Sequence, residues 1–285
     1  MIFRYSEKKA DIDQQALSHL MESCAVQFNG FVAEEFFRND NLVVAFFVPS
    51  EGVKVYEELC SKYCPSHLEE DYQAAGYMES FVALALPGKP KNAIMVRVDQ
   101  TNVHPTEWRH LILHEMAHIY CAQNEFDGKN FYQEHCADDK GDVCRNGIIN
   151  AGYAVWREFI ADYMAVVIDI AYIRLTIPQL KTEVRNLSES IYWGNLNAKT
   201  AASILLAYIL TSKAVCRSEN FDEAFGFLQK HKFITDDNRS PFFYAMIELC
   251  YQRTHSADFY QIDLDFIMKL GRAYLSVISG TKFRL

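Results

Sequence analysis

Two histidines four residues apart, in the run HEMAH at positions 114 to 118, constrain the fold of this chain more than any other short stretch. Residues spaced by four lie on one face of an α-helix, about one turn apart. A helix near 105–122, with Pro105 favourable in its first turn, therefore places both imidazoles on one side. His114 and His118 can then aim their nitrogens at a single point, as the ligands of a tetrahedral zinc ion do.

Glu115 follows the first histidine directly and lies about 100° around the helix from it. From there its carboxylate can reach a water molecule on the metal without binding the metal, which is the geometry of a general base. Because a catalytic zinc ion has three protein ligands, a third must come from elsewhere. Glu158, in the run EFIAD, is the candidate, and Asp162 falls on the same helical face four residues later. A carboxylate there can accept the spare N–H of a zinc-binding histidine.

The two motifs HEMAH and EFIAD together resemble the active site of the gluzincin branch of zinc metallopeptidases, whose best-known member is thermolysin. The resemblance implies one Zn²⁺ per chain, bound by His114, His118 and Glu158. It also implies that Glu115 activates water and that Asp162 orients a histidine ligand. The substrate would be a peptide or protein.

The resemblance covers residues 110 to 165 and departs from the family in two ways. The gap between the motifs is longer than in thermolysin. Residues 124–150 are polar, contain glycine and lack clear periodicity, so we expect a long loop there that acts as a lid. No motif identifies the side chain that stabilises the oxyanion, for which the open alternatives are two histidines and two tyrosines: His231, His255, Tyr244 and Tyr251.

Hydrophobic periodicity predicts an α+β protein. We expect a zincin-like domain over residues 1–178, with a small mixed sheet and two active-site helices, followed by an all-helical portion over 179–285 that closes the cleft. The expected strands are apolar, β-branched runs near 41–48, 80–86 and 92–98. The expected active-site helices lie near 105–122 and 152–174. Helices are also predicted near 179–190, 196–216, 221–231, 240–253 and 262–278.

Charge and composition narrow the classes of partner. A net charge of −9 and the lack of a Lys/Arg cluster argue against nucleic-acid binding. The apolar runs are too short to cross a bilayer, so no membrane partner is expected. The N-terminus has no apolar run of signal-peptide length, and the eight cysteines are interpreted as reduced thiols. Together these features predict a cytoplasmic location.

The leading hypothesis is therefore a zinc metallopeptidase that uses Glu115 as general base. We expect one strand, over 80–86 or 92–98, to form the sheet edge along which an extended peptide adds. One alternative is a catalytically restricted regulatory or binding protein on the same scaffold. Another is a zinc amidohydrolase that acts on a non-peptide amide.

Overall fold

The computed structural model describes most of the chain: residues 1–5, 13–38, 40–65, 72–99, 105–124, 131, 134–135, 142–169, 182, 185–186, 189–194, 196–216, 226, 238–254 and 262–282. The chain divides into two compact units. The first comprises residues 1–124 and 164–172, and the second comprises residues 125–163 and 173–285. The described residues form one small mixed sheet and are otherwise largely helical, so the chain combines helices and strands as expected.

The sheet belongs to the first unit and has the strand order β1-β2-β4-β3. Strands β1 (Ile2–Tyr5), β2 (Leu42–Phe47) and β4 (Asn92–Arg97) are parallel, and β3 (Ala83–Leu86) pairs with β4 in the antiparallel sense. The three strands expected from the sequence are confirmed, whereas β1 was not expected. Of the two strands expected as an edge, β4 lies inside the sheet and β3 lies at an edge, as β1 does on the opposite side.

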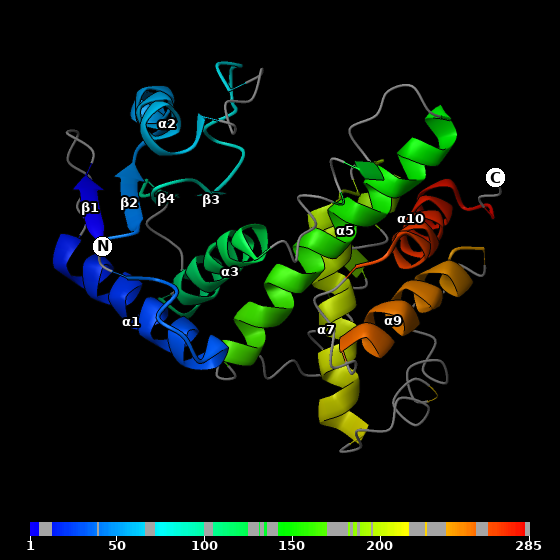
Figure 1. Ribbon diagram of the computed structural model, residues 1–285. Helices are drawn as coiled ribbons and strands as arrows, with labels where there is room; N and C mark the ends of the chain where they lie inside the picture. The colour runs from blue at the N-terminus through cyan, green and yellow to red at the C-terminus, as the bar shows by residue number, and fades with distance from the viewer. Residues whose placement is uncertain are drawn as a thin grey trace. The chain divides into compact units, whose positions relative to one another are not determined.

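Helices cover both faces of this sheet, which explains why every residue of β2 and β4 is buried. Figure 1 shows α2 (Pro49–Tyr63) on one face and α1 (Gln14–Val32) and α3 (Pro105–Gln123) on the other. Side chains alternate along a strand, so a strand covered on both sides is apolar along most of its length, and in β4 only the terminal Asn92 and Arg97 are polar. The run LVVAFF meets that requirement.

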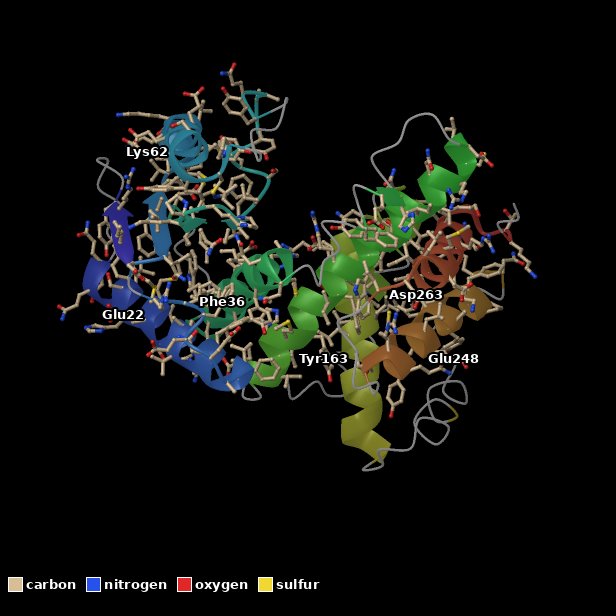
Figure 2. All side chains as sticks on the ribbon, in the orientation of Figure 1. Glu22, Phe36, Lys62, Tyr163, Glu248 and Asp263 are labelled. Carbon is tan, nitrogen blue, oxygen red and sulfur yellow. The ribbon has the colours of Figure 1, made fainter. Side chains whose placement is uncertain are left out.

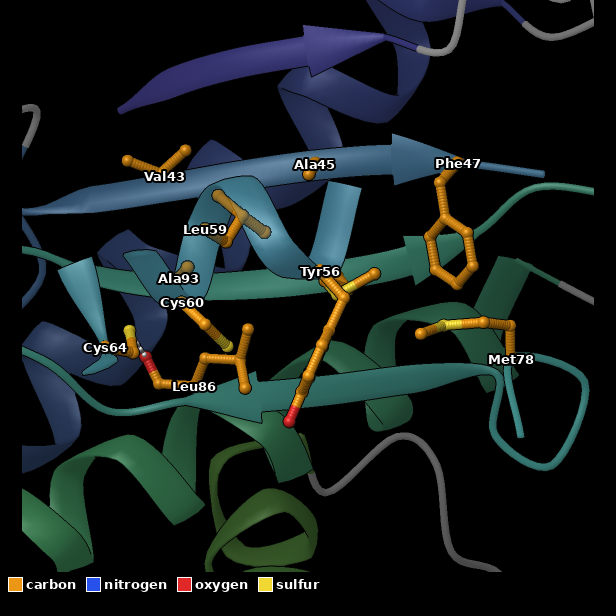
Figure 3. Close-up of a cluster of buried hydrophobic side chains, with 11 residues drawn as sticks. Val43, Ala45, Phe47, Tyr56, Leu59, Cys60, Cys64, Met78, Leu86 and Ala93 are labelled. Carbon is orange, nitrogen blue, oxygen red and sulfur yellow. Dashed lines mark hydrogen bonds between the residues drawn. The ribbon is translucent and has the colours of Figure 1, made fainter. Parts of the chain in front are cut away.

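The core under α2 is a single apolar cluster (Figure 3). Its members come from the sheet, from α2 and from the segment before β3: Val43, Ala45, Phe47, Tyr56, Leu59, Cys60, Cys64, Met78, Leu86, Ala93 and Met95. The thiol of Cys64 donates a hydrogen bond to the main-chain oxygen of Leu86 over 3.1 Å. This bond ties the end of α2 to the edge strand.

On the other face, α3 is held by α1 and by the end of α5 (Val143–Ile168). Phe36, labelled in Figure 2, packs edge-on against Tyr120 of α3 with ring centroids 4.9 Å apart. Arg109 of α3 donates to the side chain of Gln27 and lies 3.7 Å from Asp169, directly after α5. These contacts fix both ends of the helix that carries the HEMAH motif.

The second unit is helical and contains residues 143–163 of α5 together with α7 (Ala198–Cys216), α9 (Ser240–Thr254) and α10 (Leu264–Ser279). Helices α5 and α10 touch backbone to backbone at Gly152 and Gly271. A Cβ atom on Gly152 would lie 2.1 Å from the main-chain oxygen of Ile267, and one on Gly271 would lie 2.0 Å from that of Ile148. Only glycine fits at either position.

The expected long loop over residues 124–150 is wrong at its end, because α5 begins at Val143. The physical reason is a helix cap at Asp142, whose side chain accepts the N–H of Cys144 over 2.9 Å and that of Arg145 over 3.4 Å. The active-site helix expected over 152–174 accordingly starts nine residues earlier, at 143 rather than 152. Residues 170–174 lie outside the described residues.

Among the other predicted helices, those near 196–216, 240–253 and 262–278 are confirmed as α7, α9 and α10. Those near 179–190 and 221–231 lie mostly outside the described residues, as does the predicted domain boundary at 178. The division into domains stays a prediction. Within the described part of the chain, none of the helices has both the length and the apolar character needed to cross a membrane.

Candidate metal centre

The HEMAH motif lies in the middle of α3, on a helix that is almost entirely enclosed. Ile112, Leu113, Met116, Ala117 and Ile119 are all fully buried. Within this apolar setting His114 is 2% exposed, whereas His118, one turn later, is half-buried. Burying a polar ring among apolar side chains is costly unless its nitrogens have partners.

The two imidazoles converge as the sequence predicted. Their Nε2 atoms lie 3.0 Å apart, and their ring planes cross at 88°. Two nitrogens bound to one tetrahedral zinc ion at 2.0–2.1 Å would be about 3.3 Å apart. The Nε2 pair is thus within a few tenths of an ångström of the separation that one zinc ion requires, and the donor set of the first unit fits this metal.

Glu115, between the histidines, is 4% exposed and makes a contact that the sequence did not indicate. Its Oε2 atom accepts a hydrogen bond from the main-chain N–H of Ala85 over 2.7 Å. Ala85 belongs to the edge strand β3. The candidate general base is therefore attached to the sheet edge along which a peptide was expected to add.

The pairing of β3 with β4 explains why this N–H is available to Glu115. The main-chain oxygen of Val82 accepts from Arg97 over 2.8 Å, so Val82 and Arg97 form a hydrogen-bonded pair. Such pairs alternate along antiparallel strands, which turns the main-chain groups of Ala83 and Ala85 outward, away from β4. The carboxylate of Glu115 binds the outward N–H of Ala85.

The other two predicted site residues, Glu158 and Asp162, lie on the part of α5 that belongs to the second unit. Glu158 is mostly buried, and its Oε1 atom lies 3.5 Å from the guanidinium of the neighbouring Arg157. Asp162 is 5% exposed, and its Oδ2 atom accepts a hydrogen bond from the hydroxyl of Ser203 on α7 over 3.0 Å.

Two contact residues of the site were thus missed by sequence reasoning, Ala85 and Ser203. Ala85 acts through its main chain, which leaves no signal in the residue type. Ser203 is separated from Asp162 by 41 residues and belongs to no motif. Of the candidates for stabilising an oxyanion, Tyr244 and Tyr251 are on α9, whereas His231 and His255 lie outside the described residues.

Comparisons with protein family models, with curated proteins and with solved structures find no match to this chain. The geometry of the residues is therefore the basis for assigning chemistry to this site.

Proposed function

We propose that this protein is a zinc-dependent metallopeptidase with Glu115 as general base. The observation that carries the proposal is the bond from Ala85 to Glu115, because it joins the base of a histidine pair of zinc-binding geometry to an edge strand of the sheet. Hydrolysis of a peptide requires these two features together: a group that takes a proton from water, and a surface that holds the chain beside it.

The proposed ligands are His114, His118 and Glu158, each of which offers one ligand atom of a kind that zinc accepts. Glu158 is proposed as the third ligand because its carboxylate is mostly buried on α5, four residues before the predicted orienting residue Asp162.

Bound zinc supplies a Lewis acid that polarises the scissile carbonyl and makes water acidic enough to ionise near neutral pH. Glu115 takes the proton of the attacking water and delivers it to the leaving amine. The N–H of Ala85 holds one oxygen of Glu115 in place, so the proton is handled by a carboxylate of fixed orientation. Asp162 is proposed to orient a histidine ligand through its N–H.

The substrate is proposed to bind as an added strand along β3, beside the outward main-chain groups of Ala83 and the outward main-chain oxygen of Ala85, since Glu115 occupies the N–H of Ala85. Because Glu115 binds the N–H of Ala85, the scissile bond is placed next to that residue. An extended, unstructured peptide segment satisfies this geometry, whereas a folded loop does not present its main chain to a strand edge.

The burial of Glu115 favours a second candidate, a regulatory or binding protein on the same scaffold. A base that is 4% exposed and already hydrogen-bonded suits a closed site that keeps its metal for structure or sensing. The metallopeptidase and the regulatory protein differ in peptide cleavage, since the regulatory protein would bind zinc without cleaving peptides. Hydrolysis of a non-peptide amide stays an alternative. Digestion of peptides distinguishes it from the metallopeptidase, because such an amidohydrolase would leave peptides intact.

The test is digestion of a broad peptide library by the zinc-loaded protein and by Glu115→Gln, with cleavage sites mapped by mass spectrometry. We expect cleavage by the wild type and a loss of at least about 100-fold in Glu115→Gln, with zinc content unchanged. Glu34→Gln, which changes an exposed glutamate in the same way, serves as the matched control. Cleavage by Glu115→Gln at the wild-type rate would overturn the proposed role of the base.

A further inference from the structure

We propose that Ser203 is a positioning residue of the metal centre, which acts by fixing the carboxylate of Asp162. This inference rests on the proposed function, in which Asp162 orients a histidine ligand. Its direct observation is the hydrogen bond of 3.0 Å from the hydroxyl of Ser203 to Oδ2 of Asp162, both in the second unit.

A buried carboxylate is costly unless its oxygens accept hydrogen bonds. Asp162 is 5% exposed, whereas Ser203 is exposed and donates to it from α7. The ionised carboxylate is an acceptor only, and its two oxygens point in different directions. The bond from Ser203 to Oδ2 leaves the carboxylate with acceptor positions for the orienting role, and it ties the carboxylate to a donor on another helix.

The donor itself is held firmly. Helix α7 is capped by Asn197, whose side chain accepts the N–H of Thr200 over 2.9 Å. The residue before that cap, Leu196, accepts the hydroxyl of Tyr274 on α10 over 3.2 Å. Ser203 is flanked by the buried residues Ala202 and Ile204. A hydroxyl on so well anchored a helix can define the orientation of its partner rather than follow it.

A purely structural bond would affect the stability of the fold alone, so the test must measure the affinity for zinc. We would measure the zinc dissociation constant by competition with a chelator for the wild type, Ser203→Ala and Ser203→Thr. Loss of the hydroxyl should weaken zinc binding about 5- to 20-fold. Groups that do not touch the metal contribute to its binding by holding the ligands in the right orientation. Ser203→Thr keeps a hydroxyl and should stay within about twofold of the wild type.

A double-mutant cycle identifies the route of the effect. Asp162→Asn alone should weaken zinc binding about 10- to 100-fold, and adding Ser203→Ala to it should have less than about a twofold further effect. Ser276→Ala, which removes a hydroxyl that donates to the main chain of its own helix, is the matched control and should leave zinc binding unchanged. The absorption spectrum of the cobalt-substituted protein should change in Ser203→Ala and return in Ser203→Thr.

The failure of this inference can be told apart from the failure of the proposed function. A wild type that binds no zinc contradicts the metal centre itself. A wild type that binds zinc while Ser203→Ala binds it equally well overturns the role of Ser203 and leaves the metal centre standing. Fully additive effects of Ser203→Ala and Asp162→Asn would overturn it as well.

Discussion

Gly152 of α5 and Gly271 of α10 are packed so closely that neither has room for a Cβ atom. The atom that a substitution would add at Gly152 falls 2.1 Å from the main-chain oxygen of Ile267, and backbone at that distance cannot move aside cheaply. This crossing fixes α5, the helix of Glu158 and Asp162, against the rest of the second unit.

Gly152→Ala should therefore lower the free energy of unfolding by about 2–4 kcal/mol, because the two helices must separate to admit the methyl group. Gly147, one and a half turns earlier on α5, offers a matched control, since a Cβ atom there meets nothing within 4 Å. Gly147→Ala should instead stabilise by about 0.5–1 kcal/mol through helix propensity. Urea unfolding followed by circular dichroism measures both, and equal effects of the two substitutions would contradict the close crossing.

The end of α5 is tied to α3 in the first unit through Arg109 and Asp169. Arg109→Ala removes this partly buried ion pair and the bond to Gln27, and should destabilise the protein by about 1–2 kcal/mol. Arg38→Ala is the control, because Arg38 and Asp40 form a pair that is largely exposed. Its effect should stay within about 0.5 kcal/mol. Thermal unfolding of the two variants measures both losses of stability. Equal losses would contradict the greater contribution expected from the more buried ion pair of Arg109.

The buried thiol of Cys24 predicts a loss of stability in alkali. Burial raises the pKa of Cys24 from 9.0 to about 12, so the folded state keeps this proton where the unfolded state releases it. Stability from this group is complete below pH 9 and declines as the pH rises toward 12, by at most about 1.4 kcal/mol per pH unit.

The measurement is urea unfolding under reducing conditions between pH 8 and about 11, a range that begins below the ordinary thiol pKa. Cys24→Ala should show a shallower decline with pH than the wild type, whatever its stability at pH 8. Cys144→Ala, which removes an exposed thiol, should keep the wild-type slope. The prediction fails if Cys24→Ala and the wild type decline in parallel.

The bond between Ala85 and Glu115 predicts that proline substitutions on β3 differ in their kinetic effects. Ala85 and Ala83 both point their N–H groups away from β4, where proline is tolerated by a sheet. Ala85→Pro removes the donor to Glu115 and should lower kcat by about tenfold or more. Ala83→Pro leaves that bond in place and should act mainly by raising KM. Equal losses of kcat would contradict the anchoring of the base.

The parts of the site that sequence could predict are those encoded locally. His114, Glu115 and His118 are neighbours on one helix, so helix periodicity alone brings the two imidazoles together. Strand β2 was predicted because a buried strand is a short apolar run, and β3 and β4 were predicted from two such runs on either side of a Gly/Pro turn. The cap at Asp142 is also a local signal, but the polar residues around it hide the start of the helix in the sequence pattern.

The parts that sequence could not predict depend on contacts between distant segments. Strand β1 is only four residues long, and its parallel partner β2 begins at Leu42. Ala85 contributes a main-chain group that any residue other than proline would offer. Gly152 and Gly271 are unremarkable in sequence, since the close crossing that requires them is a property of the packed helices.

Metal content shows whether the HEMAH motif binds zinc. Purified wild-type protein and His118→Ala would be incubated with zinc at neutral pH, dialysed and measured by elemental analysis. His19→Ala, which changes an exposed histidine on α1, is the control. We expect about one zinc ion per chain in the wild type and in His19→Ala, and none in His118→Ala. Protein that holds no zinc in any of the three, or equal zinc in all of them, would contradict it.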